Sequence, residues 1–271
     1  MEITESLVIK VLKLAYKAGT AIMDIYQKPF DVELKDDNSP LTIADKTAHM
    51  IIAEGLSDTG LPLLSEEGIH LDYENRKKWT DFWLVDPLDG TKEFIKKNGD
   101  FTVNIALISN QQPVFGVVYA PVPGFIYWGS SSGSFRLDVK HSADIEFIRS
   151  QELETKAKKL PYILNPDGYL VLGSRSHMNA ETELFINDLR KSHPDLTFVS
   201  SGSSLKFCTL AEGGADIYPR FGPTMEWDTA AGHAVAIFAG CSVIQADNGL
   251  PVVYNKPSLK NPFFIAQRKK K

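Results

Sequence analysis

The sequence is poor in cysteine. Only two of its 271 residues are cysteines, Cys208 and Cys241, and each lies within an apolar segment. Isolated cysteines in apolar segments are typical of buried free thiols in a reducing compartment. No Cys/His cluster has the spacing of a zinc site. The cysteine content therefore argues against a disulfide-stapled secreted domain and against a zinc protein.

Long hydrophobic runs are also lacking. The longest mostly apolar stretch, residues 234–244, is too short to span a bilayer. Glu2 and Glu5 precede the first apolar residues, with no basic region and no cleavage site, so no signal peptide is expected. These features predict a cytoplasmic protein without a transmembrane segment. The basic end, residues 268–271, is compatible with a weak peripheral contact at the inner face of the membrane.

Positive charge is not in excess. The formal net charge is -5, so no general affinity for nucleic acid is expected. An anionic small molecule would then need local cations or metal ions. Neither a phosphate-binding Walker A sequence nor a Gly-x-Ser-x-Gly nucleophile elbow occurs. At 43% hydrophobic and 23% charged residues, the composition is that of an ordinary globular protein with one large or two modest domains.

Hydrophobic periodicity predicts a mixed α/β protein. In the first half, helices are expected over residues 4–26 and from the N-cap Thr42 to about residue 56, with strands over 61–64 and 82–85. An antiparallel meander is expected over 101–109, 113–120, 125–129 and 134–139. Later, helices over 180–190, 203–211 and 228–239 alternate with strands over 169–172, 196–199, 215–219, 242–245 and 263–266.

The charged and then proline-rich stretch at 151–167 is the predicted boundary between two parts. Residues 1–159 form an N-terminal α+β part, and residues 160–271 form a C-terminal α/β part. Most acidic candidate residues lie in the first part and Asp228 lies in the second. An active site is therefore expected where the two parts meet.

One stretch concentrates the chemistry, Asp86-Pro-Leu-Asp-Gly-Thr91. The apolar run 82–85 delivers it, so a strand is expected to end in a turn there. Pro87 prevents a helical continuation, which lets Asp86 and Asp89 converge on one point. Gly90 allows close approach of the backbone to a bound group, and Thr91 adds a hydroxyl. The alternative is a turn without function between two elements.

Further acids stand at predicted element ends, namely Asp45, Glu66, Glu67 and Asp228. Carboxylates suit Mg²⁺, and paired Mg²⁺ ions are suited to phosphoryl transfer to water. Each acid also has a purely structural explanation. Asp45 fits a capping box, the Glu66-Glu67 pair fits solvated surface, and Asp228 fits the N-terminal dipole of a helix. Spacing alone leaves these alternatives open.

The sequence resembles the inositol monophosphatase superfamily, a group of Mg²⁺-dependent, lithium-sensitive phosphomonoesterases. The resemblance is carried by Asp86-Pro-Leu-Asp-Gly-Thr91, Trp227-Asp-Thr-Ala-Ala-Gly232 and Leu64-Ser-Glu-Glu67. Within it, the chain resembles the CysQ-type 3'(2'),5'-bisphosphate nucleotidases most closely. That resemblance rests on Trp83-Leu-Val-Asp-Pro-Leu-Asp-Gly-Thr-Lys-Glu-Phe-Ile95, Phe101-Thr-Val-Asn-Ile-Ala-Leu107, Gly202-Ser-Ser-Leu-Lys-Phe-Cys208 and Tyr218-Pro-Arg-Phe-Gly-Pro-Thr224. It implies an α/β fold, a layered αβαβα sandwich of the sugar phosphatase type.

The resemblance also implies a metal site of two or three Mg²⁺ ions. The first ion would be held by Glu66, Asp86 and the Leu88 carbonyl, and the second by Asp86, Asp89 and Asp228. A weaker third ion would touch Asp45 or Glu67. The catalytic residues would be Asp45, Thr91 and Glu66, with Asp45 and Thr91 helping to activate the attacking water.

The implied substrate is a small phosphorylated nucleotide, adenosine 3',5'-bisphosphate, with its 5'-phosphosulfate derivative as a further candidate. The expected binding residues are Gly90, Thr91, Ser174, Arg175, His177, Ser203, Ser204, Lys206, Arg220 and Asp228. Arg220 suits an anionic substrate better than an acid would at that place. Two alternatives remain, an inositol monophosphatase or broad sugar phosphatase, and a non-catalytic metal- or nucleotide-binding regulator. The oligomeric state does not follow from the sequence.

Overall fold

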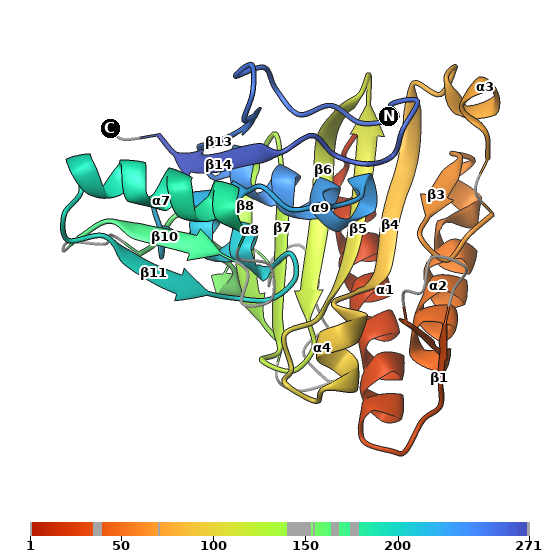
Figure 1. Ribbon diagram of the computed structural model, residues 1–271. Coiled ribbons are helices and arrows are strands. Elements are labelled where there is room, and N and C mark those ends of the chain that lie inside the picture. The colour runs from red at the N-terminus through yellow and green to blue at the C-terminus, as the bar shows by residue number, and fades with distance from the viewer. Residues whose placement is uncertain are drawn as a thin grey trace.

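The structure is a computed structural model that describes residues 2–34, 40–69, 71–139, 153, 155–163, 168–173 and 179–269. Two large sheets organise it (Figure 1). The seven-stranded sheet has the order β3 (Leu63–Ser65), β4 (Asp81–Asp89), β5 (Thr102–Ser109), β6 (Gln112–Ala120), β7 (Phe125–Ser130), β8 (Gly133–Asp138) and β9 (Lys158–Lys159). The five-stranded sheet has the order β11 (Thr197–Ser200), β10 (Leu170–Gly173), β12 (Ile217–Arg220), β14 (Phe264–Arg268) and β13 (Cys241–Gln245).

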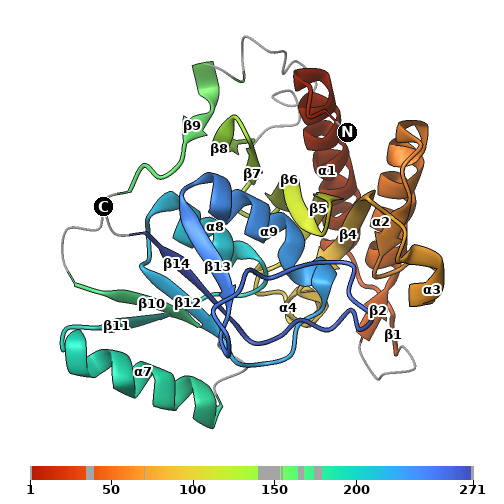
Figure 2. The same cartoon turned by 90° about the horizontal axis from the view of Figure 1, so that it is seen from above.

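Helices cover both sheets in layers (Figures 1 and 2). The outer face of the seven-stranded sheet is covered by α1 (Glu5–Tyr26) and α2 (Ile43–Leu56). Between the sheets lie α8 (Leu205–Glu212) and α9 (Glu226–Phe238). The far face of the five-stranded sheet is covered by α7 (Ala180–Ser192). This αβαβα sandwich confirms the expected fold class.

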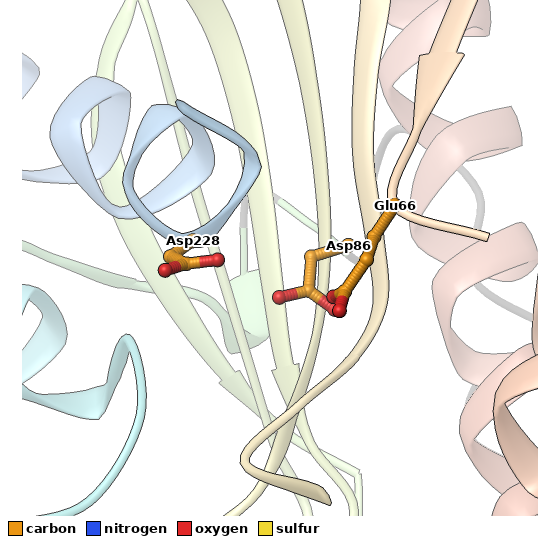
Figure 3. Close-up of side chains that lie close together, drawn as sticks. All are labelled: Glu66, Asp86 and Asp228. Carbon is orange, nitrogen blue, oxygen red and sulfur yellow. The ribbon is translucent and has the colours of Figure 1, made fainter. Parts of the chain in front are cut away.

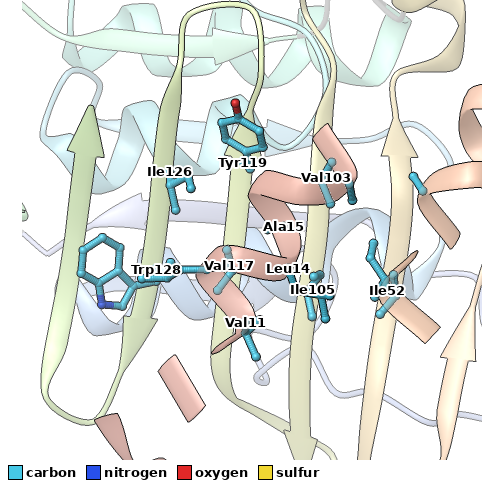
Figure 4. Packing of buried hydrophobic residues seen from close by; sticks show 14 of the residues in the cluster. Val11, Leu14, Ala15, Ile52, Val103, Ile105, Val117, Tyr119, Ile126 and Trp128 are labelled. Atoms are coloured by element: carbon cyan, nitrogen blue, oxygen red, sulfur yellow. The ribbon is translucent and has the colours of Figure 1, made fainter. Parts of the chain in front are cut away.

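The near-continuous apolar strands are explained by burial of both faces of the seven-stranded sheet. Successive side chains of a strand point to opposite faces. In β4, Trp83 and Val85 therefore pack with the α1/α2 layer, and Phe82 and Leu84 pack with the α8/α9 layer. Figure 4 shows the first of these interfaces, where α1 lies across β5 and β6.

The inner helix α9 packs unusually close to the seven-stranded sheet because glycines face it. A Cβ atom on Gly116 of β6 would lie 2.6 Å from the Ala231 carbonyl oxygen, and one on Gly129 of β7 would lie 2.7 Å from that of Ala234. Real Cβ atoms do not approach backbone so closely, so only glycine fits at both positions. These contacts set the depth of α9, and hence the position of its N-terminal residues.

Three local expectations needed correction. β4 does not end at residue 85 but continues through Pro87 to Asp89, with an irregular register between Asp86 and Asp89. Bulges are among the few places where a strand accommodates proline, because it lacks an N–H group. No strand is expected between the first two helices, but a small hairpin of β1 (Val32–Leu34) and β2 (Pro40–Thr42) lies there. No helix is expected between the strands over 61–64 and 82–85, but the short helix α3 (Tyr73–Arg76) lies there.

Other details agree with the sequence. Two further short helices are η1 (Ser57–Thr59) and α4 (Thr91–Ile95). Cys208 and Cys241 are buried and free, as predicted. Among the described helices, none is long and apolar enough to cross a membrane.

Candidate metal centre and anion pocket

Three carboxylates meet at the centre of the molecule. Glu66 follows β3, Asp86 lies in β4 and Asp228 lies in the first turn of α9. One carboxylate oxygen of each lies within 4.8 Å of the others. Figure 3 shows Asp86 between the other two. The structure therefore brings together three acids that the sequence places at distant element ends.

Backbone N–H groups orient these aspartates. Asp86 Oδ1 accepts a hydrogen bond from the Leu88 N–H group at 3.0 Å, across the irregular part of β4. Asp228 Oδ2 accepts one from the Met225 N–H group at 2.9 Å, and so caps α9. No hydrogen bond from the described residues reaches the second oxygen of either carboxylate. One oxygen thus fixes the side chain, and the other remains available for a ligand.

A buried acid anchors the start of α9. Glu226 has no exposed surface and accepts hydrogen bonds from the Asn255 N–H group at 2.6 Å and the Lys256 N–H group at 3.0 Å. Lys256 Nζ forms an ion pair with it at 2.5 Å. These bonds tie Glu226 to the 255–256 loop. The loop therefore helps to hold the helix end that presents Asp228.

Asp89 lies beside the cluster rather than within its tightest part. Its Oδ2 atom accepts a hydrogen bond from the Ser204 N–H group at 2.6 Å, at the start of α8, and a longer one of 3.4 Å from Asn104 Nδ2. Its charge raises the pKa values of Asp86 and Asp228. Asp89 therefore links the acidic cluster to the 201–206 loop.

The cluster favours a bound cation. Burial, followed by repulsion from neighbouring carboxylates, raises the pKa values of Asp86 and Asp228 well above their usual range. Burial also raises the pKa of Asp89 to about 6, although Lys206 opposes the shift. Buried like charges are costly unless a counterion compensates them. An all-oxygen donor set of this kind suits Mg²⁺.

Asp45 caps its helix and also contacts Thr91, although the sequence alone presents a capping role and a role in the site as alternatives. Its Oδ2 atom accepts hydrogen bonds from the Thr42 N–H group at 2.7 Å and the Thr42 hydroxyl at 2.6 Å, which forms the capping box. Its Oδ1 atom accepts a hydrogen bond from the Thr91 hydroxyl at 3.1 Å. Burial raises the pKa of Asp45, and the charge of Glu67 raises it further.

Gly90 lies where only glycine fits. Its φ angle is +96°, in the left-handed region, and an added Cβ atom would lie 2.9 Å from the Asp100 carbonyl oxygen. This conformation lets the chain turn from β4 into α4 beside the acids. Gly90 and Thr91 thus both lie at the acidic cluster, as expected for this stretch.

A pocket of about 110 Å³ adjoins the cluster. Its lining includes the acids Asp89 and Asp228 and the cations Lys206 and Arg220. Within the described chain, Arg220 Nε is a buried donor without a hydrogen-bond partner, and so is the Ser203 hydroxyl. Orphaned donors beside two cations are suited to an anionic group.

Lys206 is less free than the sequence suggests. Its side chain is buried, and its Nζ atom donates to the carbonyl oxygens of Ser201 at 3.1 Å and Ser203 at 2.8 Å. Burial lowers its pKa to about 8. Lys206 therefore shapes the 201–204 loop as well as contributing positive charge to the pocket. Ser174, Arg175 and His177 lie outside the described residues.

Sequence reasoning missed the buried polar residues Thr102 and Asn104 of β5. Both contact the Ser204 hydroxyl, and Asn104 also contacts Asp89. They lie on the same face of the strand, separated by the apolar Val103. Two polar residues at alternate positions of an otherwise apolar strand were the available signal.

Fold and site together define a layered α/β protein with a carboxylate cluster suited to a metal ion beside a pocket lined by two cationic side chains. The chain belongs to the inositol monophosphatase family, whose sequence pattern matches residues 4–269.

Its relatives are similar over almost their whole length. The chain is 45% identical over 260 residues to the 3'(2'),5'-bisphosphate nucleotidase CysQ of Escherichia coli (strain K12), which covers 94% of this chain and 97% of that protein. It is 34% identical over 269 residues to the protein of the same name from Haemophilus influenzae, covering 98% and 94%. The crystal structure of CysQ from Bacteroides thetaiotaomicron matches with a TM-score of 0.89 and 46% identity, covering 98% of both chains.

Proposed function

We propose that this chain is a Mg²⁺-dependent 3'(2'),5'-bisphosphate nucleotidase that hydrolyses adenosine 3',5'-bisphosphate to AMP and phosphate. The single observation that carries the proposal is the juxtaposition of the carboxylate cluster with a pocket containing Lys206 and Arg220. A substrate with two phosphates needs a metal centre for the phosphate that is cleaved and a separate cationic subsite for the phosphate that remains. The similarity to CysQ proteins supports the same substrate.

The proposed metal ligands are those that the family resemblance implies. Glu66, Asp86 and the Leu88 carbonyl would hold one Mg²⁺ ion, and Asp86, Asp89 and Asp228 a second. Asp45 or Glu67 would touch a weaker third ion. When bound, Mg²⁺ supplies a low-pKa water and neutralises charge on the phosphoryl oxygens. The oxygen-rich, electrostatically strained cluster supports this assignment.

Asp45 and Thr91 form the proposed proton-handling pair. The Thr91 hydroxyl donates its hydrogen to Asp45 Oδ1, so its lone pairs can accept a hydrogen bond from a water molecule. Asp45 is in turn fixed by Thr42. In this proposal the Thr91 hydroxyl orients a water molecule and Asp45 receives its proton. Thr42 holds Asp45 in place, as a third group commonly does for a catalytic base. Glu66 is the remaining proposed catalytic residue.

The remaining phosphate is proposed to bind near Arg220 and Lys206, with help from Ser203 and Ser204. The cleaved phosphate would meet the N–H groups of Gly90 and Thr91. We assign Ser174, Arg175 and His177 to the same substrate site on the family resemblance alone, and Asp228 would border both subsites. The 5'-phosphosulfate derivative carries charge in the same places and is proposed as a second substrate.

A substrate panel tests the proposal. Purified protein is assayed with adenosine 3',5'-bisphosphate, its 5'-phosphosulfate derivative, inositol 1-phosphate and fructose 1,6-bisphosphate, with Mg²⁺, without Mg²⁺ and with added Li⁺. We expect the highest kcat/KM for the nucleotide, no turnover without Mg²⁺ and inhibition by Li⁺. Faster turnover of inositol 1-phosphate would favour the alternative inositol monophosphatase activity. Metal binding without any turnover would favour a regulator.

The location of the protein in the cell and its division into two parts complete the proposal. We place the protein in the cytoplasm, with a peripheral membrane contact through the basic C-terminal end as an open alternative. We also keep the division into parts at residues 1–159 and 160–271. Cleavage near residue 159 by a protease at low concentration, with two stable fragments, would support that division.

A further inference from the structure

A buried hydrogen-bond chain runs from β5 to the metal centre. The Thr102 and Ser204 hydroxyls lie 2.8 Å apart, and the Ser204 hydroxyl donates to Asn104 Oδ1 at 2.8 Å. Asn104 Nδ2 then donates to Asp89 Oδ2 at 3.4 Å. Thr102, Asn104 and Ser204 are each at most 2% exposed. Three buried polar side chains thus connect to Asp89, which is itself partly exposed at the pocket.

The Asn104 amide has one consistent orientation. Asp89 offers only acceptors to its neighbours when ionised, so the Asn104 amide must present its NH₂ group to it. The amide oxygen then accepts hydrogen bonds from the Ser204 hydroxyl at 2.8 Å and the Thr102 hydroxyl at 3.2 Å. The orientation of the Asn104 side chain is therefore fixed at both ends.

The same arrangement divides the two oxygens of Asp89. Oδ2 accepts from both the Ser204 N–H group and Asn104. Oδ1 accepts no hydrogen bond from any residue that the structure describes. One oxygen is therefore occupied by protein donors, and the other is left for a cation. The Ser204 N–H group alone would leave the carboxylate free to rotate about that bond.

We propose that Asn104 is a positioning residue that holds Asp89 ready for the second metal ion. Through Ser204, it also fixes the 201–206 loop of the anion pocket against the same carboxylate. The inference rests on the proposed role of Asp89 as a ligand of the second ion alone. Outer partners that orient metal ligands commonly change metal affinity by 10- to 100-fold.

Titration calorimetry with Mg²⁺ and with Mn²⁺, in the absence of nucleotide, tests the inference. For the wild type we expect two binding events. For Asn104→Ala we expect the weaker event to lose about 10-fold or more in affinity. The tighter event should change by less than about twofold, because the Asn104 side chain bonds Asp89, whereas Asp86 pairs with Asn104 only through the backbone register of β4 and β5. Equal weakening of both events would indicate general structural damage and overturn the inference, as would two unchanged events.

Two further variants keep the test sharp. Asn104→Leu has a similar size but no donor, so it should reproduce the selective loss even where the alanine variant folds poorly. Thr102→Val is the matched control, since it removes a hydroxyl that bonds Ser204 and the Asn104 oxygen but leaves the Asn104 NH₂ group that contacts Asp89. We expect it to change the weaker event by less than about threefold. A loss in Thr102→Val as large as in Asn104→Leu would contradict a specific role for Asn104.

The readout separates this inference from the proposed enzyme activity. Two metal-binding events with a selective loss in Asn104→Leu, but no nucleotide hydrolysis, would support the positioning role and reject the activity. Nucleotide hydrolysis with unchanged metal binding in both Asn104 variants would do the reverse. A wild type that binds a single metal ion overturns the inference.

Discussion

The Thr91 hydroxyl lies 3.1 Å from Asp45 Oδ1, although the two residues are 46 positions apart in the chain. Thr91 begins the short helix after β4, and Asp45 lies in the first turn of α2. The contact joins two helix starts beside the carboxylate cluster. It places a hydroxyl and a buried carboxylate where a water molecule can be oriented.

Replacing Thr91 with valine removes this hydroxyl at nearly constant shape. We expect kcat to fall by about 10²- to 10⁴-fold, the range for loss of proton transfer by a positioned group. The affinity for Mg²⁺ should change little, because Thr91 Oγ1 is not among the proposed metal ligands. Steady-state kinetics and calorimetric Mg²⁺ titration measure the two effects. Thr47→Val is the matched control, because it makes the same Thr-to-Val change at a hydroxyl that bonds the Ile43 carbonyl oxygen within α2. This variant should retain full activity.

Asp86 lies at the point where all the acids repel one another. Replacing it with asparagine should abolish Mg²⁺-dependent turnover, because Asp86 is the proposed ligand of both ions. The same change removes a buried charge that burial and its neighbours destabilise. We therefore expect the metal-free variant to unfold at a higher temperature than the metal-free wild type. Thermal unfolding with EDTA and with Mg²⁺ checks this, and retained activity would refute the metal assignment.

Gly116 is expected to be intolerant of any side chain. An alanine Cβ atom would overlap the backbone of α9, so the helix or strand must shift. We expect a loss of about 1–3 kcal/mol in the free energy of unfolding, as for overpacked cores. Mg²⁺ binding should also weaken, because α9 carries Asp228. Urea unfolding measures the first effect. Gly222→Ala is the control, since its Cβ atom would meet nothing closer than 3.7 Å.

His233 predicts an acid-dependent loss of stability. Burial in α9 lowers its pKa from 6.5 to about 3, so the folded protein keeps it neutral. Between about pH 6.5 and pH 3 the unfolded chain therefore binds one more proton at this position. Stability falls as the pH decreases through that range, by about 1.4 kcal/mol per pH unit from this group.

His233→Gln isolates the contribution of His233, because glutamine does not titrate and can still bond the Tyr254 hydroxyl that lies 2.9 Å from His233 Nδ1. Urea unfolding at several pH values should show the wild type losing stability faster than the variant below pH 6.5. Above pH 7 the difference between the two proteins should be constant. Parallel curves across the whole range would contradict the assignment.

Local pattern was sufficient for much of the fold. The helix over residues 5–26 was predictable because its apolar stripe repeats every three to four residues and packs against one sheet face. The meander was predictable because its strands are apolar on both faces and are separated by turn residues. The acids near Asp86 could be found because they stand together in the sequence, and the family resemblance then linked them to Asp228.

Features that depend on a distant partner were less accessible. The continuation of β4 past Pro87 requires β5, whose Asn104 and Thr102 pair with Asp86 and Asp89 across the irregular register. The β1–β2 hairpin has an exposed first strand, so no hydrophobic alternation announces it. The link from Asn104 to Ser204 spans 100 positions and forms only when α8 docks on the sheet. No local propensity encodes such contacts.

The close packing of α9 on the seven-stranded sheet, at Gly116 and Gly129, has a consequence for the chain as it is synthesised. Every strand of the seven-stranded sheet is made before α9 emerges, yet Leu84, Ala106 and Val118 on its inner face are covered only by the later helices. A nascent chain that stops before Glu226 therefore exposes an apolar sheet surface and has no Asp228 to complete the acidic cluster. Such intermediates are prone to aggregate. Truncated products of this protein should accordingly depend on chaperones, while the chain that includes α9 closes its own sheet in the step that brings Asp228 to the carboxylate cluster.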